Sequence, residues 1–307
     1  MEEQFLSLLG TDRNCAGGAM PWGSWITCEE SMDLVSARGR KHGYCFEVAA
    51  APGTGLQQAT PLTALGRFRH EAVALDPDTG VLYLTEDTKD GLLYRFVPKN
   101  FVPSERIDFH QGRLQALAIM DTPSCDLRNY DPEAPQIPEG QPMNVTWIDL
   151  DEVDSPADDL RHRGFKSGAA RFARGEGIHY DKGSIYICAT DGGPGHQGQI
   201  FKLTPGKTET LTLFLQSRES DLLTNGDNLT ATSWGDLIIC EDLTNKHGHK
   251  TPHIRGITKD GKIYTLARNA LNKSEFAGST FSPDGKTLFV NIQTPGHTLA
   301  ITGPWQA

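Results

Sequence analysis

Short apolar runs, each introduced by a turn that contains glycine, recur along this chain. Each run holds β-branched, aromatic or leucine residues and ends on an acidic or amide residue. The clearest copies span residues 74–87, 178–191, 230–242 and 281–291, and a weaker copy spans 21–30. A glycine turn followed by such a run is the pattern of a β-hairpin and not of a helix.

The spacing of these copies indicates one repeated architecture. Their polar ends fall near residues 30, 87, 191, 242 and 292, so most copies are about 50 residues apart. Repeats of about 40–50 residues that are built from short strands are typical of a β-propeller. One gap has twice that length, which leaves room for a further blade or a long insertion.

The segments between the copies fit the same architecture. Alternating runs at 91–98, 198–205 and 211–215 predict outer strands, residues 121–142 predict a loop, and residues 149–160 predict one short helix. We therefore expect an all-β fold, a β-propeller of about six blades with five of them evident. We expect it to form a single domain over residues 1–307.

Composition and charge exclude several classes of protein. The 307 residues are 37% hydrophobic, which is enough for a core without a disulfide scaffold, and we expect the cysteines in the apolar runs to be buried free thiols. The formal net charge is −10 and no basic stripe is present, so nucleic-acid binding is disfavoured. No apolar stretch is long enough to span a membrane, and the acidic start is unlike a signal peptide. We expect a monomer that acts on a small substrate.

Acidic residues occupy the same place at the end of several copies. In a propeller the equivalent ends of the innermost strands meet around a central channel, where clustered carboxylates repel unless cations neutralise them. Ca²⁺ prefers such oxygen ligands. The alternative is that each acid is a solvated turn residue. The residues in this set are Glu29, Glu30, Glu86, Asp87, Asp191, Glu241 and Asp242.

A second polar series lies just before the hairpins. Glu71 and Glu176 precede the turn in two copies, and Asp227 with Asn228 occupies the matching place in a third. Cys15, followed by two glycines, could bind a transition metal because thiolate is a soft ligand; taken alone it could equally be a packed thiol.

Several longer motifs are spread over nearly the whole sequence. They are Arg13-Asn-Cys-Ala-Gly-Gly18, Thr27-Cys-Glu-Glu30, Gly66-Arg-Phe-Arg-His-Glu-Ala72, Leu84-Thr-Glu-Asp87, Ser274-Glu-Phe-Ala-Gly278, Phe281-Ser-Pro-Asp-Gly285, Phe289-Val-Asn-Ile-Gln-Thr-Pro-Gly296 and Ile301-Thr-Gly-Pro-Trp305. Together these motifs resemble the PhoX family of bacterial alkaline phosphatases. The resemblance implies a propeller phosphomonoesterase with a cluster of Fe³⁺ and Ca²⁺ in its channel, acting in the periplasm or outside the cell.

The resemblance also implies roles for particular residues. Cys15 resembles the thiolate that ligates iron, Glu71 and Glu176 resemble cluster carboxylates, and the remaining acidic residues above, with Asn228, are candidates for the other metal positions. The family usually carries a longer segment, with an export leader, ahead of the Arg13 motif. We expect this segment to be missing here, and a propeller that lacked a blade's worth of strand would have an open edge.

A phosphate ester would be repelled by an acidic ring unless bound cations reversed its sign, so the expected mechanism depends on metal. Arg13, Arg69 or Arg174 could clamp a phosphate oxygen. Two alternatives stay open. One is a propeller lactonase with a single Ca²⁺ held by Glu71, Asn228 and Asp242, and the other is a propeller remnant that binds without catalysis.

Overall fold

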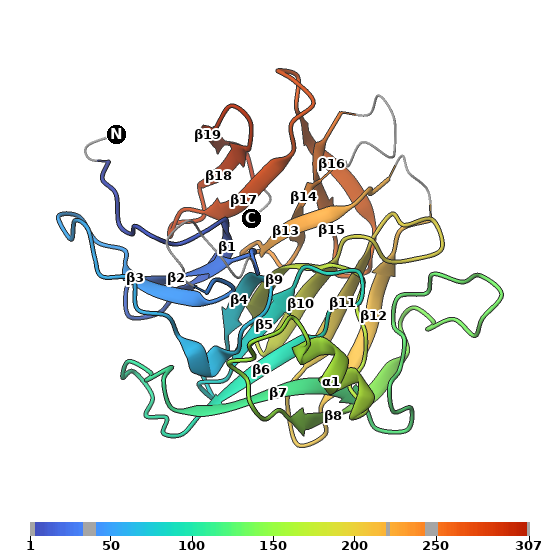
Figure 1. Cartoon of the computed structure of the whole chain (residues 1–307). Coiled ribbons are helices and arrows are strands. Elements are labelled where there is room, and N and C mark those ends of the chain that lie inside the picture. Colours follow the sequence, from blue (N-terminus) through green and yellow to red (C-terminus); the bar gives the residue numbers. More distant parts are fainter. Residues whose placement is uncertain (1–3, 33–40, 219–221, 243–250, 306–307) are drawn as a thin grey trace. The chain divides into compact units, whose positions relative to one another are not determined.

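The computed structural model of the protein describes residues 4–32, 41–218, 222–242 and 251–305. The described chain divides into two compact units. Unit 1 contains residues up to 126 together with 144–175, and unit 2 contains residues 127–143 and those from 176 onward. The described residues form nineteen strands and one α-helix, which confirms the all-β prediction (Figure 1).

Unit 1 contains two antiparallel groups of strands, β1–β3 and β4–β8, with neighbours along the chain paired to each other. Strand β1 also makes one parallel bridge to β4, between Gly17 and Ala72. The elements are β1 (Asn14–Met20), β2 (Ser24–Glu29), β3 (Cys45–Ala49), the 3₁₀ helix η1 (Thr63–Leu65), β4 (His70–Leu75), β5 (Leu82–Glu86), β6 (Leu93–Pro98), β7 (Gly112–Ile119), β8 (Pro142–Asp149) and α1 (Leu160–Lys166).

Unit 2 contains three antiparallel groups, β9–β12, β13–β16 and β17–β19. Each group follows the chain order, so every strand pairs with the next one. The elements are β9 (Gly175–Asp181), β10 (Ser184–Ala189), β11 (Gln199–Thr204), β12 (Thr210–Gln216), β13 (Gly226–Ala231), β14 (Leu237–Glu241), β15 (His253–Ile257), β16 (Ile263–Arg268), β17 (Phe276–Phe281), β18 (Thr287–Ile292) and β19 (His297–Thr302).

The predicted hairpins are present in all five copies. In each of them the first two strands of a group are joined at the expected glycine, as at Gly80 with φ +73° and Gly285 with φ +69°, where a side chain would be strained. The apolar runs form the second strand of each group. β5 and β14 are buried along their whole length, which explains why these runs read as continuous rather than alternating.

The first strands of the groups carry β-bulges. The register shifts between Cys15 and Gly18 in β1, between His70 and Val73 in β4, and between Gly226 and Leu229 in β13. A β-bulge bends the strand and changes the direction of the side chains at the bulge. The sequence-predicted acids Glu71 and Asp227 lie within two of these bulges.

Glycine also allows the first strands of neighbouring groups to approach closely. A Cβ atom on Gly18 would lie 2.2 Å from the carbonyl oxygen of Val73 in β4, and one on Gly177 would lie 2.6 Å from the carbonyl oxygen of Asp227. Both pairs lie within a single unit. The small residues in these strands are therefore required by packing of backbone against backbone.

The helix begins later than the sequence predicts. We expected it within residues 149–160, but α1 spans Leu160–Lys166 and residues 150–159 form an irregular segment. Asp158 and Asp159 accept local side-chain hydrogen bonds from Arg161 and Ser155, which compete with a helix, and Asp154 accepts one from the distant Tyr44, which holds the segment in place. The predicted loop at 121–142 is confirmed up to the start of β8.

Candidate metal centre

Cys15, Glu30 and Glu71 converge in unit 1. The Sγ of Cys15 and one carboxylate oxygen each from Glu30 and Glu71 all lie within 4.8 Å of one another. Cys15 belongs to β1, Glu30 follows the last residue of β2, and Glu71 belongs to β4. The three side chains thus come from three strands, and one thiol with two carboxylates forms a donor set that suits a multivalent cation.

The geometry of β1 and β4 explains this convergence. The bridge between Gly17 and Ala72 places the two bulged segments beside each other, and Cys15 and Glu71 lie at those bulges. Residue 15 also pairs with Cys28 in β2, so Glu30 is only two residues beyond the partner of Cys15. Bulges of this kind are common next to functional sites because they redirect a side chain.

The carboxylate of Glu71 is in an unfavourable environment as a free anion. The side chain is buried, and its Oε1 atom has no hydrogen-bond partner among the described residues. Burial and the charges of Asp87 and Glu30 raise the pKa of Glu71 to about 8, although bonds from Cys15 and the Ala16 backbone oppose the shift. A buried oxygen without a partner is costly, and a bound cation would satisfy it, so the residues present fit a metal.

Glu30 belongs to a chain of charged groups that ends in an arginine on each side. Its carboxylate lies 3.3 Å from Nε of Arg13. Burial, the charge of Asp87 and a hydrogen bond shared with Asp87 raise the pKa of Glu30, and the charges of Arg13 and Arg174 lower it. Asp87 in turn accepts two hydrogen bonds from Arg174, at 2.7 Å from Nε and 3.0 Å from Nη2.

Two of the predicted arginines have a positive φ angle, which is unusual for residues other than glycine. Arg13 immediately precedes β1 and Arg174 immediately precedes β9, with φ values of +49° and +53°. Asn225 precedes β13 in the same conformation, at φ +48°. Residues other than glycine rarely adopt this region, and they do so mainly where function or the surrounding structure requires it. In each case the residue two positions later is a candidate ligand.

Unit 2 offers a second pair of carboxylates. Ligand oxygens of Glu176 in β9 and Asp227 in β13 lie within 4.8 Å of each other. The close approach of Gly177 to the backbone of Asp227 and Asn228 brings the two strands together at this place. Both residues were predicted from the series that precedes the hairpins.

Glu29, also predicted as a ligand, is hydrogen-bonded to the protein on both oxygens. Oε1 accepts from the Asp12 backbone at 2.9 Å and lies 2.8 Å from Nδ1 of His42. Oε2 accepts from the backbone of Gly43 and Tyr44 at 2.8 and 3.1 Å. This carboxylate therefore joins the segment before β1 to the start of β3, and its geometry favours a structural role.

Glu241 and Glu86 hold the matching position in their groups. Glu241 accepts from the backbone of Thr224 at 3.1 Å and of His253 at 2.9 Å, and from Nε of Arg255 at 2.8 Å. Glu86 accepts from the Leu92 backbone at 3.1 Å and from the Tyr94 hydroxyl at 2.8 Å. All three glutamates pair with the first residue of their group's first strand.

The other predicted residues of unit 2 are engaged with nearby groups. Asp191 accepts from the Tyr130 hydroxyl at 2.9 Å and lies 3.3 Å from Nδ1 of His196. The Asn228 amide oxygen accepts from the Gly278 backbone at 2.6 Å. The backbone of Asp242 donates to the Asn225 carbonyl at 2.8 Å.

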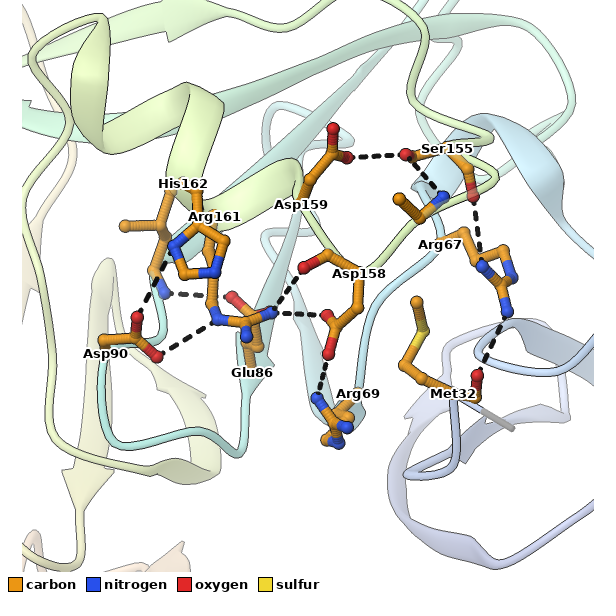
Figure 2. A network of polar contacts seen from close by, with 12 residues as sticks. Met32, Arg67, Arg69, Glu86, Asp90, Ser155, Asp158, Asp159, Arg161 and His162 are labelled. Atoms are coloured by element: carbon orange, nitrogen blue, oxygen red, sulfur yellow. Dashed lines mark hydrogen bonds and ion pairs between the residues drawn. The ribbon is translucent and has the colours of Figure 1, made fainter. Parts of the chain in front are cut away.

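Arg69 is paired with a residue that the sequence did not single out. Figure 2 shows its guanidinium directed at Asp158, which also binds Arg161. Asp158 lies in the irregular segment before α1, and Arg161 lies in the first turn of α1. No repeat or motif of the sequence includes either residue. The only signal in the sequence is the density of charged residues around α1, which is common on any exposed helix.

The cysteines other than Cys15 are free and buried, as predicted. Cys15 is the exception among the six because it is accessible to solvent. An accessible thiol beside two carboxylates is the expected environment for a ligand rather than for a packed thiol.

The described residues thus define an all-β protein in which one thiol and two carboxylates meet near the starts of β1 and β4 and just after β2. The family described as alkaline phosphatase PhoX matches the chain over residues 1–296. The chain therefore belongs to the PhoX alkaline phosphatase family, and the resemblance seen in its motifs is confirmed.

A solved structure supports the fold. PhoX of Pseudomonas fluorescens, solved with the transition-state analogue vanadate, is 23% identical with a TM-score of 0.69, and the match covers 92% of this chain and 65% of that chain. This chain thus spans less than two thirds of that relative. A gluconolactonase of Xanthomonas campestris is 10% identical with a TM-score of 0.48, covering 91% of this chain and 69% of that one. No protein of curated function matches in sequence.

The described part of the chain contains no helix that is long and apolar enough to cross a membrane.

Proposed function

We propose that the protein is a metal-dependent phosphomonoesterase that releases inorganic phosphate from small esters. The observation that carries the proposal is the convergence of Cys15, Glu30 and the buried, unpartnered carboxylate oxygen of Glu71, in a member of the PhoX family. Bound multivalent cations would neutralise this acidic site and stabilise the charge that develops on the transferred phosphoryl group.

The residues of the chain have distinct roles in this proposal. Cys15, Glu30 and Glu71 hold metal in unit 1, and Glu176 and Asp227 hold metal in unit 2. A thiolate ligand favours iron among the available metals, and carboxylates favour Ca²⁺, so the proposed cofactors are Fe³⁺ and Ca²⁺. Asp191 and Asp242 stay candidate ligands for Ca²⁺, whereas the amide oxygen of Asn228 accepts a hydrogen bond from the Gly278 backbone and is the weaker candidate.

Arg174 is the proposed phosphate-binding residue. Its guanidinium is fixed on one side by the two hydrogen bonds to Asp87, and its side chain is 24% exposed. A guanidinium has five N–H donors in one plane, so a single arginine can contact a carboxylate and a phosphate oxygen at the same time. Asp87 is then a positioning residue rather than a ligand. Arg13, which is 69% exposed and paired with Glu30, is the second candidate for this role.

The repeated hairpin groups are the proposed blades of a β-propeller, of which five are evident. We propose about six blades in all, a single domain, a monomeric state and a site of action outside the cytoplasm, as family membership suggests. The lactonase alternative is less well supported, because the Asn228 amide oxygen that it requires is hydrogen-bonded to the Gly278 backbone.

The proposal is tested by chelation and reconstitution. Dialysis of the purified protein against EDTA is expected to abolish hydrolysis of a chromogenic phosphate monoester. Iron with Ca²⁺ should restore it better than either metal alone. Hydrolysis that survives exhaustive chelation would refute the metal-dependent mechanism. Turnover of lactones but not of phosphate esters, with a single Ca²⁺ per chain, would favour the lactonase instead.

A further inference from the structure

Two guanidinium groups share one carboxylate in unit 1. Nη1 of Arg69 binds one oxygen of Asp158, and Nη1 of Arg161 binds the other. Figure 2 shows both guanidinium groups directed at the Asp158 carboxylate, with Arg161 to its left and Arg69 below it. Partial burial alone would raise the pKa of Asp158, but the hydrogen bonds and charges of Arg161 and Arg69 outweigh it and hold the pKa below its ordinary value.

Arg161 and Arg69 differ in the interactions that they make with residues other than Asp158. Nε of Arg161 donates to Asp90 at 3.1 Å, and its Nη1 lies 3.7 Å from the buried carboxylate of Glu86. The Arg161 side chain is only 12% exposed. Arg69, which immediately precedes β4, is fixed through its backbone, since its carbonyl accepts from the backbone N–H of Asp87, just after β5, at 3.1 Å. Arg161 therefore stays ordered whether or not Asp158 is present.

Asp158 itself lies on a short exposed segment between two anchored residues. Ser155 is buried, and its carbonyl accepts from the buried guanidinium of Arg67 at 3.1 Å. Asp159 is bound by the Ser155 hydroxyl at 2.6 Å. Pro156 and Ala157 between them are exposed. Rotation of the Asp158 side chain would thus free both guanidinium groups without disturbing the anchors.

We propose that Arg69 and Arg161 form an oxyanion subsite and that Asp158 occupies it as a resident carboxylate, which limits the binding of a second phosphate group. Carboxylate and phosphate oxygens are recognised by guanidinium groups through the same hydrogen bonds. Specificity often depends on such a repulsive element as well as on attractive contacts. The inference deepens the proposed function, because it assigns Asp158 as a determinant of which phosphate compounds bind.

The phosphate group has two possible sources. It can be free inorganic phosphate, the product of the proposed reaction, or a second phosphate on the substrate. Titration with inorganic phosphate addresses the first source, and a comparison of a bisphosphate with its monophosphate addresses the second. In wild type, Asp158 should disfavour both.

The test is calorimetric titration of inorganic phosphate into wild type and Asp158→Asn, with Asp159→Asn as the matched control. Asp159 is the adjacent carboxylate and bonds to Ser155 and Arg163 instead of to Arg69 or Arg161. We expect Asp158→Asn to bind one additional phosphate per chain, at least about tenfold more tightly than wild type does at that site. Asp159→Asn should behave as wild type.

A second pair of variants decides whether the arginines make the subsite. The additional phosphate binding should be absent from the double variant Asp158→Asn/Arg161→Gln. Asp158→Ala removes the same carboxylate and should also gain the phosphate site, so it replaces Asp158→Asn if that variant fails to fold. In the same variants, the affinity for a bisphosphate relative to its monophosphate should rise with Asp158→Asn or Asp158→Ala only.

The proposal is overturned if neither Asp158 variant gains a phosphate site, or if the gain persists when Arg161 is replaced. Either result can occur in a protein that hydrolyses phosphate esters normally. Conversely, a gain that depends on Arg161 supports the subsite even in a preparation that shows no hydrolysis. Failure of the subsite and failure of the proposed function are therefore separable.

Discussion

Glu71 and Glu29 are both buried carboxylates in unit 1, but they differ in how far hydrogen bonds from the protein satisfy their oxygens. Glu29 accepts hydrogen bonds on both oxygens from its own protein, so its charge is satisfied by folding. Glu71 has a buried oxygen without a partner and a pKa raised to about 8 by burial and by neighbouring acids. The hydrogen bonds to Glu29 stabilise the fold, whereas the environment of Glu71 is unfavourable without metal and becomes favourable when a cation binds.

Replacement of Glu71 by glutamine is expected to remove metal without harming the fold. In the metal-free protein the buried Glu71 carboxyl keeps its proton up to about pH 8, so at neutral pH one neutral group replaces another and chelated Glu71→Gln should be about as stable as chelated wild type. Above pH 8, where the wild-type carboxylate is charged, the variant should be more stable by about 1 kcal/mol. Bound metal per chain should fall. Urea unfolding of the chelated proteins, with elemental analysis before chelation, measures both effects.

Glu29→Gln is the matched contrast, since it places the same substitution at the structural position. An amide cannot accept all four hydrogen bonds, so at least one buried donor loses its partner, at a cost of about 1–3 kcal/mol. The free energy of unfolding should fall with or without metal. A Glu29→Gln protein of normal stability that had lost its metal would reverse the two assignments.

The charge of Glu86 is expected to make stability depend on pH. Burial raises the pKa of Glu86 from 4.5 to about 7, opposed by Arg161 and by hydrogen bonds from Tyr94 and Leu92. An acid whose pKa is higher in the folded state holds its proton more tightly there. The contribution of Glu86 to stability is therefore full below about pH 4.5 and is lost as the pH rises towards about 7.

Thermal unfolding of wild type and Glu86→Gln at a series of pH values between 4.5 and 8 isolates this contribution. Relative to the variant, wild type should lose stability between pH 4.5 and about pH 7, and the difference between the two proteins should be constant from there to pH 8. Parallel curves for the two proteins over the whole interval would show that Glu86 does not titrate there.

The strands and turns of this protein differ in how far the sequence determines them. The five hairpins were predicted correctly, because a turn glycine and an apolar run are local signals. The bulges in β1, β4 and β13 were not predicted. One extra residue in a strand leaves the hydrophobic pattern almost unchanged, although it redirects Glu71 and Asp227. The helix was placed too early because side-chain bonds from Asp154, Asp158 and Asp159 hold that segment in an irregular form.

The close approach of β1 to β4 gives a prediction about packing. Gly18→Ala would place a Cβ atom 2.2 Å from the Val73 carbonyl oxygen, so the two strands must separate. We expect a loss of about 2 kcal/mol in the free energy of unfolding and weaker metal binding, since Cys15 and Glu71 lie on these strands. Gly195→Ala is the control, because its Cβ would make only an ordinary contact with the Gln197 side chain.

Denaturant unfolding with metal analysis of both glycine variants provides the measurement. Equal stability of Gly18→Ala and Gly195→Ala would mean that the strands can accommodate a methyl group, and the packing argument would then be wrong.

For the whole molecule, the sequence predicted which residues are acidic at strand ends but not which of them are free to bind metal. Glu29, Glu86 and Glu241 follow the same pattern as Glu30, and only the structure shows that donors of the protein already bind both oxygens of Glu29 and of Glu241. Glu86 is hydrogen-bonded on Oε2 alone, and its buried Oε1 faces Arg161 at 3.7 Å without a hydrogen bond. Those donors lie at the starts of other strands, at positions that no local motif predicts. Arg69 was likewise predicted as a phosphate clamp, while its pairing with Asp158 depends on the irregular segment before α1, 89 residues further along the chain.

The net charge of −10 affects how an anionic substrate can bind. Part of it is placed beside Cys15 and Glu71, where an anionic substrate would be repelled unless cations were bound first. The account therefore predicts that metal loading and phosphate-ester hydrolysis rise and fall together.

The most direct test is elemental analysis of purified wild type and Cys15→Ser, with hydrolysis of a phosphate monoester measured on the same samples. Cys125→Ser, which changes a thiol that contacts neither Glu30 nor Glu71 in the described structure, serves as the control. The account predicts iron in wild type and in Cys125→Ser, and loss of both iron and hydrolysis in Cys15→Ser. Unchanged iron and an unchanged rate in Cys15→Ser would contradict it.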